Sequence, residues 1–370
     1  MQLIVLYFVI IQFFKSSYFY RILIYFIFAI MQKLKAIKDI INYSEGIPMT
    51  KVHGKIKPLK KENYLLLPLA IGGDAPKDFI QAYIYGDSYK AKKGNWAKYI
   101  AKVGHKYYPI ESINEHLLNR IGEVLGLKMA KSHLVLADNQ IRFLSLYFIN
   151  SDEEELVHGA NIFSAYLSEP SNTFVQSVED MKLSREFFTF QFTLKAIKSV
   201  FPLQQEKIIN DLVKMLFFDA ISGNNDRHFY NWGVLKDIRG KKDPVFSPIY
   251  DSARGLFWNI KESQIIDVFE KNTIHPGYMD RYINKYVNKS MPKTGWNGIE
   301  TINHFELIKL ICVHYPEYEN SCRILCNSEL IENVLEMIKK EFCNFFTKKR
   351  LILVEECIKV RFSTLQKIFK

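Results

Sequence analysis

The spacing of apolar residues predicts a chain that begins with strands and continues with helices. Short apolar runs bounded by turn residues are typical of strands, and they occur before residue 150. Asp138 and Asn139 separate two of these runs and favour a tight turn, because both residue types tolerate a positive φ angle. The strand-like stretches are 63–85 with internal turns, 96–103, 132–137 and 141–149.

One helix is predicted inside this strand-rich part, over residues 112–125. Ser112 and Glu115 have the spacing of a capping box, and Gly126 is a typical helix terminator. The apolar residues between them recur at three- and four-residue intervals and share one face. They are Ile113, Leu117, Leu118, Ile121, Val124 and Leu125.

After about residue 155 the pattern is mainly helical, interrupted by a hairpin-like region over 231–250. Strands with one helix, followed by helices, predict an α+β chain with two lobes. We expect a small mixed lobe over 46–149 and a helical lobe over 150–370, after an N-terminal segment at 1–45. The predicted helices are 185–200, 205–222, 305–315, 328–346 and 351–369.

The N-terminal segment is apolar and then basic, and we leave it out of the fold prediction. Residues 1–31 carry two charges, and each apolar run is shorter than the roughly 18–20 residues that cross a bilayer. The segment lacks the basic start and small-residue cleavage site of a signal peptide. Two interpretations stay open: translation that starts at Met31 or Met49, or a membrane-associated helix whose following lysines keep the rest cytoplasmic.

Composition is that of a folded protein. Of the 370 residues 48% are hydrophobic and 24% charged, which argues against a disordered chain, and five cysteines exclude a disulfide scaffold. The net charge of +11 is compatible with anionic partners such as phosphate-bearing ligands, but a solvated basic surface is the simpler explanation. No basic run carries a nucleic-acid-binding motif. Cys322 and Cys326 lack the further ligands that a zinc site needs.

The most informative stretch runs from Gly223 to Gly233 and contains Asp226 and, five residues later, Asn231. Asp251 follows a predicted strand twenty residues further on. This order is typical of kinase-type phosphoryl transfer, in which the first Asp orients the acceptor hydroxyl and takes its proton. The Asn and the later Asp then hold Mg²⁺ at the phosphates of ATP. Each residue alone is also compatible with a turn or a cap.

Two upstream residues complete the pattern. Lys102 ends a predicted strand and Glu115 lies on the next helix, which is the order that a phosphate-positioning Lys–Glu ion pair requires. Taken alone, Lys102 is compatible with a solvated lysine and Glu115 with the acid of a capping box. The whole set in the required order predicts a kinase.

Together with residues 248–259, the Gly223–Gly233 stretch resembles the HipA-like serine/threonine kinases of bacterial toxin–antitoxin systems. The resemblance covers roughly residues 75–310 and implies a protein-kinase-like fold. Arg227 and His228 flank Asp226 and receive no role. Further matching stretches are 113–118, 126–127, 130–135, 143–148, 156–159, 292–296 and 303–305.

The resemblance assigns roles residue by residue. It implies that Asp226 is the catalytic base, that Asn231 and Asp251 bind Mg²⁺, and that Lys102 contacts the ATP phosphates with Glu115 as its partner. The segment from Leu146 to Phe148 then meets the adenine through its backbone. The implied substrate is a protein, and translation components such as aminoacyl-tRNA synthetases are one class that the family phosphorylates.

The sequence departs from kinase and family patterns in two places. No G-x-G-x-x-G loop precedes Lys102, and the local candidate is the stretch 86–90 with Gly94. Ser88 falls where the family carries an inhibitory phosphorylated serine. The N-terminal subdomain of longer HipA proteins is not recognisable, so we expect a separate partner of that kind, or an antitoxin.

Two other functions stay open at this point. The order Asp226-Arg-His-x-x-Asn231 also resembles the catalytic loop of phosphoinositide kinases, and the apolar segment 1–31 with the lysines of 51–61 suits a membrane substrate. A pseudokinase that only binds a partner is the second alternative. The complete set of Lys102, Asp226, Asn231 and Asp251 argues against it.

Overall fold

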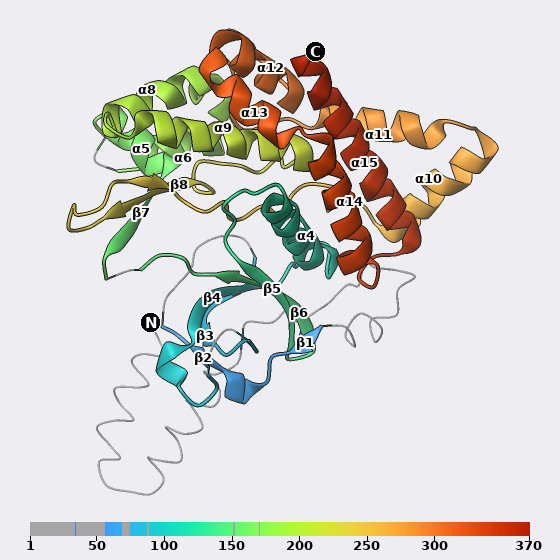
Figure 1. The fold of residues 1–370 in the computed structure, drawn as a ribbon, viewed down its shortest axis with the longest axis horizontal. Coiled ribbons are helices and arrows are strands. Elements are labelled where there is room, and N and C mark those ends of the chain that lie inside the picture. Colours follow the sequence, from blue (N-terminus) through green and yellow to red (C-terminus); the bar gives the residue numbers. More distant parts are fainter. Residues whose placement is uncertain (1–33, 35–55, 69–74, 87–88, 151, 170) are drawn as a thin grey trace, which may run out of the picture.

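A computed structural model describes residues 34, 56–68, 75–86, 89–150, 152–169 and 171–370. The small lobe is a six-stranded sheet in the order β1-β5-β6-β4-β3-β2 (Figure 1). β1 runs parallel to β5, and the other neighbours are antiparallel. The strands are β1 (Lys57–Pro58), β2 (Tyr64–Leu66), β3 (Lys77–Ala82), β4 (Ala97–Lys102), β5 (Ser132–Ala137) and β6 (Gln140–Leu146).

The predicted tight turn between β5 and β6 is confirmed. Asp138 and Asn139 have φ angles of 49° and 59°, which is the backbone conformation that a two-residue hairpin turn requires. The two strands pair in register from Ser132↔Ser145 to Ala137↔Gln140. Asp138-Asn139 is therefore a sequence signal that the structure follows directly.

The helix of the small lobe, α4 (Ile110–Val124), packs its predicted apolar face on the sheet. Its start differs from the prediction, since the N-cap is Pro109 and no side chain caps the helix. The Ser112 hydroxyl instead accepts a hydrogen bond from the Gly104 amide at 3.0 Å. The expected capping box is therefore wrong, and Glu115 is available for another partner.

The helical lobe lies above the sheet in Figure 1 and also contains a three-stranded sheet in the order β7-β8-β9. Its strands are β7 (Glu154–His158), β8 (Gly233–Asp237) and β9 (Val245–Phe246). Its helices are α5 (Gly159–Tyr166), α6 (Thr173–Asp180), α7 (Ser184–Phe187), α8 (Phe190–Val200), α9 (Gln205–Ser222), α10 (Glu262–Ile274), α11 (Tyr278–Lys289), α12 (His304–His314), α13 (Glu319–Leu325), α14 (Ser328–Phe342) and α15 (Lys348–Gln366). Short 3-10 helices are η1 (Lys61–Asn63), η2 (Lys93–Asn95), η3 (Pro316–Tyr318) and η4 (Lys367–Phe369).

Most predicted helices of this lobe are confirmed, and α9 has the predicted bounds. The predicted helix over 185–200 is wrong as one element, because it divides into α7 and α8. Thr189 begins α8, with its side chain accepting a hydrogen bond from the Phe192 amide, and the Phe190 amide donates to the Gly295 carbonyl. The break therefore makes room for the 292–296 segment to dock.

The two lobes share one large hydrophobic core, which extends from α4 into the helices of the second lobe. Arg120 on α4 donates to Glu341 on α14 through Nε and Nη2, both at 2.9 Å. α4 contacts the sheet on one side and α14 on the other. It therefore fixes the helical lobe relative to the strands that carry the site.

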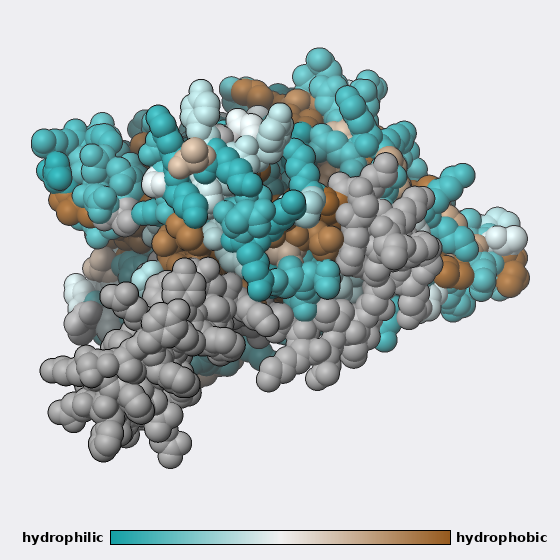
Figure 2. Space-filling model, turned by 90° about the horizontal axis from the view of Figure 1, so that it is seen from below, coloured by the Kyte–Doolittle hydropathy of each residue, from teal (hydrophilic) through white to brown (hydrophobic). Residues whose placement is uncertain are grey.

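The apolar segment 1–31 and residues 51–55 of the lysine-rich stretch 51–61 lie outside the described residues. No helix in the described part of the chain has the length and hydrophobicity needed to cross a bilayer. On the face drawn in Figure 2, the described residues are mainly hydrophilic, with hydrophobic residues in separate small groups. Cys322 and Cys326 are buried in the core, as expected of structural cysteines.

Candidate active site

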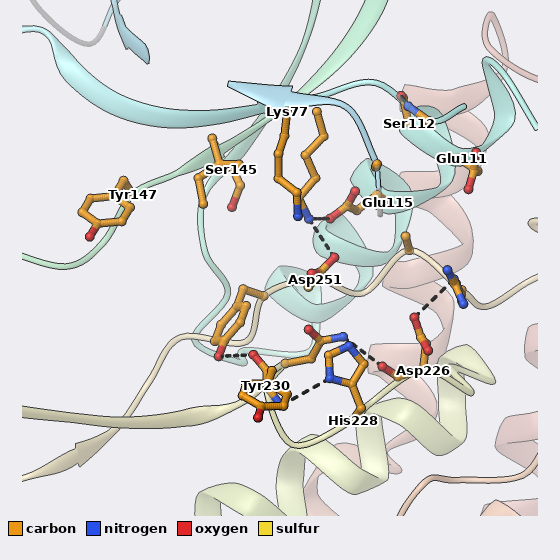
Figure 3. Close-up of a pocket in the computed structure, with 18 of the residues that line it drawn as sticks. Lys77, Glu111, Ser112, Glu115, Ser145, Tyr147, Asp226, His228, Tyr230 and Asp251 are labelled. Carbon is orange, nitrogen blue, oxygen red and sulfur yellow. Dashed lines mark hydrogen bonds and ion pairs between the residues drawn. The ribbon is translucent and has the colours of Figure 1, made fainter. Parts of the chain in front are cut away.

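A cavity of about 760 Å³ lies between the sheet and the helical lobe. Strands β3, β4 and β6, the start of α4, the loop after α9 and the segment 250–254 all contribute lining side chains. Ligand pockets for small molecules usually have volumes of about 300–1,000 Å³. The cavity is therefore large enough for a nucleotide, and Figure 3 shows the polar side chains that converge in it.

Lys102, at the end of β4, forms two ion pairs in this cavity. Its Nζ lies 2.8 Å from Glu115 Oε1 and 2.7 Å from Asp251 Oδ1. Burial alone would raise the pKa of Asp251, but the Lys102 ammonium outweighs burial and lowers it to about 2. Burial raises the pKa of Glu115, and Lys102 offsets this only in part. Asp251 is therefore held as a carboxylate in the pocket.

A second lysine, Lys77, faces the same cavity. Lys77 on β3 is the register partner of Lys102 on β4, so both side chains project from the same face of the sheet (Figure 3). Like charges directly opposite each other destabilise a sheet unless anions compensate them. The carboxylates of Glu115 and Asp251, which both lie within electrostatic range of Lys77, supply that compensation.

The residues of the predicted catalytic loop follow α9, whose C-cap is Gly223 with a φ angle of 66°. The Asp226 amide donates to Asn224 Oδ1 at 3.2 Å, and Asn231 Nδ2 donates to the Asp226 carbonyl at 2.9 Å. These hydrogen bonds join residues within the loop and hold its backbone in one conformation. The side chains of Asp226 and Asn231 both line the cavity, opposite Lys102 and Asp251.

Arg227, to which the sequence assigned no role, is the buried centre of this loop. Its guanidinium forms a bidentate pair with Asp219 of α9, with Nε–Oδ2 and Nη2–Oδ1 distances of 3.0 and 2.9 Å. It also donates to the Asn231 carbonyl, the Tyr250 carbonyl and the Ser252 hydroxyl. Arg227 therefore fixes both residues predicted to bind the metal, because it bonds Asn231 directly and both neighbours of Asp251.

His228, the other flanking residue, points into the cavity beside Asp226 (Figure 3). Its Nδ1 accepts a hydrogen bond from the Tyr230 amide at 3.3 Å. Burial lowers the pKa of His228, and the neighbouring carboxylates offset this only in part. The imidazole is therefore neutral at pH 7, with Nδ1 as acceptor and Nε2 carrying the proton.

The opposite end of the cavity is lined by the end of β6 and the residues that follow it, including Leu146 and Phe148. The amides of Leu146 and Tyr147 already donate to the carbonyls of Lys131 and Lys98. Backbone recognition of a purine by this segment would therefore fall on its carbonyl groups and on the amide of Phe148. The Phe148 and Tyr250 rings, with centroids 5.7 Å apart, form an aromatic wall beside it.

The pocket has donors that suit Mg²⁺. Asn231 uses its Nδ2 for the Asp226 carbonyl and Asp251 uses Oδ1 for Lys102, so Asn231 Oδ1 and Asp251 Oδ2 stay available as oxygen ligands. Mg²⁺ is commonly held by one or two protein oxygens together with waters and substrate phosphates. Within the described ranges no cluster of three or more His, Cys, Asp or Glu side chains forms an all-protein metal site. The residues therefore fit a magnesium ion that arrives with a nucleotide.

The chain matches a known protein family over more than half of its length. A family model described as the HipA-like C-terminal domain matches residues 69–273, more than half of the chain. The chain belongs to the HipA-like family. The family match includes Lys77, Lys102, Asp226 and Asp251, and it ends before the 292–296 and 303–305 stretches. Among curated proteins, none matches the chain.

Solved structures show the fold of this HipA-like chain. The proinflammatory kinase CtkA of Helicobacter pylori superimposes with a TM-score of 0.61 at 16% identity, over 82% of this chain and 96% of CtkA. HipA of Shewanella oneidensis MR-1, solved with HipB and operator DNA, gives 0.44 at 12% identity, over 81% of this chain and 65% of HipA. The predicted two-lobed, kinase-like α+β fold is confirmed. Family and fold together indicate kinase-type phosphoryl transfer as the class of chemistry.

The structure of this HipA-like chain brings the predicted site residues into one cavity. Lys102, Glu115, Asp226, Asn231 and Asp251 all line it, as do Leu146 and Phe148. The weak phosphate-loop candidates do not join them, since Gly86 and Gly94 are not among the lining residues and Ser88 lies outside the described part. Sequence reasoning missed Lys77. The signal was the turn sequence Gly72-Gly73-Asp74, three residues before a lysine that starts a strand.

The backbone of Asp251 and of the segment after it has an unusual conformation that contacts with α4 hold in place. Asp251, Leu256 and Phe257 have φ angles of 53°, 43° and 62°, which non-glycine residues adopt only where the surroundings enforce them. On α4, Asn114 Nδ2 donates to the carbonyls of Ala253 at 3.1 Å and Gly255 at 2.9 Å.

Gly255→Ala is expected to destabilise the HipA-like fold and to lower any activity of the site. A Cβ at position 255 would lie 2.3 Å from the Ser222 carbonyl oxygen, so backbone must move. Overpacking of this kind costs about 1–3 kcal/mol. Urea denaturation measures the loss. Gly94→Ala, which has open space around its Cβ, is the matched control, and equal stability of the two variants would contradict the expectation.

Proposed function

We propose that this chain is a protein kinase that transfers the γ-phosphoryl group of ATP, with Mg²⁺, to a Ser or Thr hydroxyl of a protein. The observation that carries the proposal is the double ion pair of Lys102 with Glu115 and Asp251, opposite Asp226 and Asn231 in one cavity. Phosphoryl transfer needs little covalent chemistry from the protein. It needs charge and positioning, which this arrangement supplies.

The role of each residue follows from its place. Lys102 and Lys77 offer two cations to the phosphates, and Glu115 holds Lys102 from the α4 side. Asn231 and Asp251 would hold Mg²⁺, whose charge stabilises the charge on the transferring phosphoryl group. Asp226 lies in the cavity near both, where an acceptor hydroxyl can approach it and give up its proton.

The test is transfer of label from [γ-³²P]ATP by the full chain in the presence of Mg²⁺, offered a lysate, purified proteins and phosphoinositide vesicles. We expect label on Ser or Thr of protein. EDTA or Asp251→Asn should reduce the rate by at least about 10²-fold, because the metal's charge stabilisation is lost. Asp267→Asn on exposed α10 is the control for a lost carboxylate.

Other results would contradict the proposal in different ways. Label confined to lipid would establish a lipid kinase. ATP binding to the folded chain without any transfer, under all these conditions, would identify a pseudokinase. Transfer that persists in EDTA would contradict the proposed role of Mg²⁺ but not the proposed kinase activity.

We also propose that the kinase acts in the cytoplasm and that a separate protein restrains it, either an antitoxin or a small partner equivalent to the N-terminal subdomain of longer HipA proteins. Family membership supports this. A HipA protein has been solved together with HipB, which makes a partner protein a reasonable search target for this chain. The acceptor protein would then be a component of translation, as the family resemblance implies.

A further inference from the structure

Arg254 contacts the catalytic loop with both its backbone and its side chain. Its Nε lies 3.2 Å from Asp226 Oδ2, the contact drawn as a dashed line from Asp226 in Figure 3. Its carbonyl accepts a hydrogen bond from the Asn225 amide at 3.2 Å. The side chains of Arg254 and Asp226 are 32% and 25% exposed, so the pair lies at the mouth of the cavity, where a substrate can reach it.

The guanidinium of Arg254 is itself held in place from the small-lobe side. Its Cζ lies 5.3 Å from the ring centroid of Trp258, which is cation–π distance. The Trp258 ring in turn meets the Tyr107 ring edge-on, with centroids 5.5 Å apart. Tyr107 belongs to the loop that leads into α4, and its amide donates to Glu111 Oε2 at 3.0 Å. A chain of contacts therefore connects the start of α4 to the carboxylate of Asp226.

The backbone around Arg254 is equally restrained. Asn114 holds the carbonyls of Ala253 and Gly255 on either side of it, and the Leu256 amide donates to the Ser222 carbonyl at 3.1 Å. Arg350 of α15 donates from Nη1 to the Phe257 carbonyl at 3.1 Å, and its own charge is paired with buried Glu262. Arg254 therefore extends from a segment that the rest of the fold keeps in one conformation.

We propose that Arg254 is a positioning residue for the catalytic carboxylate. The terminal torsion of an Asp side chain is broad and roughly two-fold, so the carboxylate of Asp226 needs an external contact to choose an orientation. Arg254 binds Oδ2 and so turns Oδ1 toward the space where the acceptor hydroxyl must approach. This inference rests on the proposed function. It adds that the alignment of the base depends on a residue outside the catalytic loop, held by the Trp258–Tyr107 contact.

The inference predicts how phosphoryl transfer responds to substitution of Arg254 in the full chain. Arg254→Met is expected to lower kcat by about 10²-fold, since misplacement of a reacting group by about 1 Å has effects of that size. The KM for ATP is expected to stay within about two-fold, because Arg254 acts on the acceptor side. The kcat of Arg254→Lys should fall between those of the wild type and Arg254→Met, because lysine keeps the charge but loses the planar donor geometry. Methylguanidinium added to Arg254→Ala should restore part of the rate.

A double variant separates positioning from a merely structural role. If Arg254 acts through Asp226, then Arg254→Met in the Asp226→Asn background costs little beyond Asp226→Asn alone, because residues that act as a unit are non-additive. Arg239→Met, at an exposed position in the β8–β9 connection, is the control for a lost arginine. Denaturation midpoints are measured for all variants, so that a lower rate caused by unfolding is recognised.

Each result decides the inference. Wild-type rates in Arg254→Met, or an additive loss in the double variant, would overturn it. Faster transfer by Arg254→Met would also overturn it, and would show that the Arg254–Asp226 pair blocks the base. Failure of the proposed function has a different signature, because the wild type itself would then transfer no label, and this inference would fall with it.

Discussion

Asp226→Asn is expected to abolish most phosphoryl transfer while leaving ATP binding within a few-fold of the wild type. An asparagine keeps the size of the side chain but cannot accept the proton of the acceptor hydroxyl, and loss of general base catalysis lowers rates by about 10²–10⁴-fold. The backbone bonds of the loop run through the Asp226 amide and carbonyl, so its structure should survive. Single-turnover transfer and equilibrium binding of ATP measure the two effects separately.

Asp243→Asn serves as the control for Asp226→Asn, because Asp243 is exposed and bonds only Gln204 in the described structure. Equal transfer by Asp226→Asn and the wild type would contradict the assignment of the base. The same variant also tests the toxin proposal. Expression of the wild type should slow growth of the host, and expression of Asp226→Asn should not.

Arg227→Met is expected to destabilise the protein by about 3–5 kcal/mol, which is typical when one partner of a buried ion pair is removed. Arg227 and Asp219 have side chains only 2% and 1% exposed, so the substitution leaves a buried carboxylate whose remaining described partner is the Asn224 amide group. The loop and the 250–252 segment would also lose their shared anchor. Chemical denaturation measures the change in the free energy of unfolding.

Replacing both partners separates the two roles of Arg227. Arg227→Met with Asp219→Leu removes the unpaired charge, and such replacements of a buried pair are often neutral or stabilising. We expect the double variant to regain much of the lost stability but little activity, because nothing then bonds the carbonyls of Asn231 and Tyr250. A loss below about 1 kcal/mol in Arg227→Met would show that water or rearrangement satisfies Asp219.

The parts of the site that sequence predicted are those whose chemistry follows chain order. Asp226 and Asn231 lie five residues apart in one loop. Lys102 is the last residue of β4, and Glu115 lies on the helix that follows, α4. Short spacing between functional residues on recognisable elements leaves few arrangements in space. The same holds for the β5–β6 turn and for α9, where local residue preferences and tertiary packing agree.

The parts that sequence missed depend on contacts between distant residues. Arg227 is a conspicuous cation in the motif, but its bonds to the Tyr250 carbonyl and Ser252 span 23 and 25 positions. Asn114 reaches Gly255 across 141 positions, with no pattern that links them. The Ser112 capping box failed for a local reason, because the helix begins at Ile110 and the hydroxyl of Ser112 accepts from the Gly104 amide eight positions away.

Adjacent side chains on α4 connect β4 with the segment that follows Asp251. Glu115 holds Lys102, while Asn114, one residue earlier, holds the backbone just after Asp251. Moving this helix outward would break both sets of bonds, and turning the Asp251 segment over would break those of Asn114. Each polar group left buried without a partner costs about 1–3 kcal/mol. A compound that requires either rearrangement would lose that energy from its affinity. Ligand design for this cavity should therefore favour compact molecules that bind while the bonds of Glu115 and Asn114 stay intact.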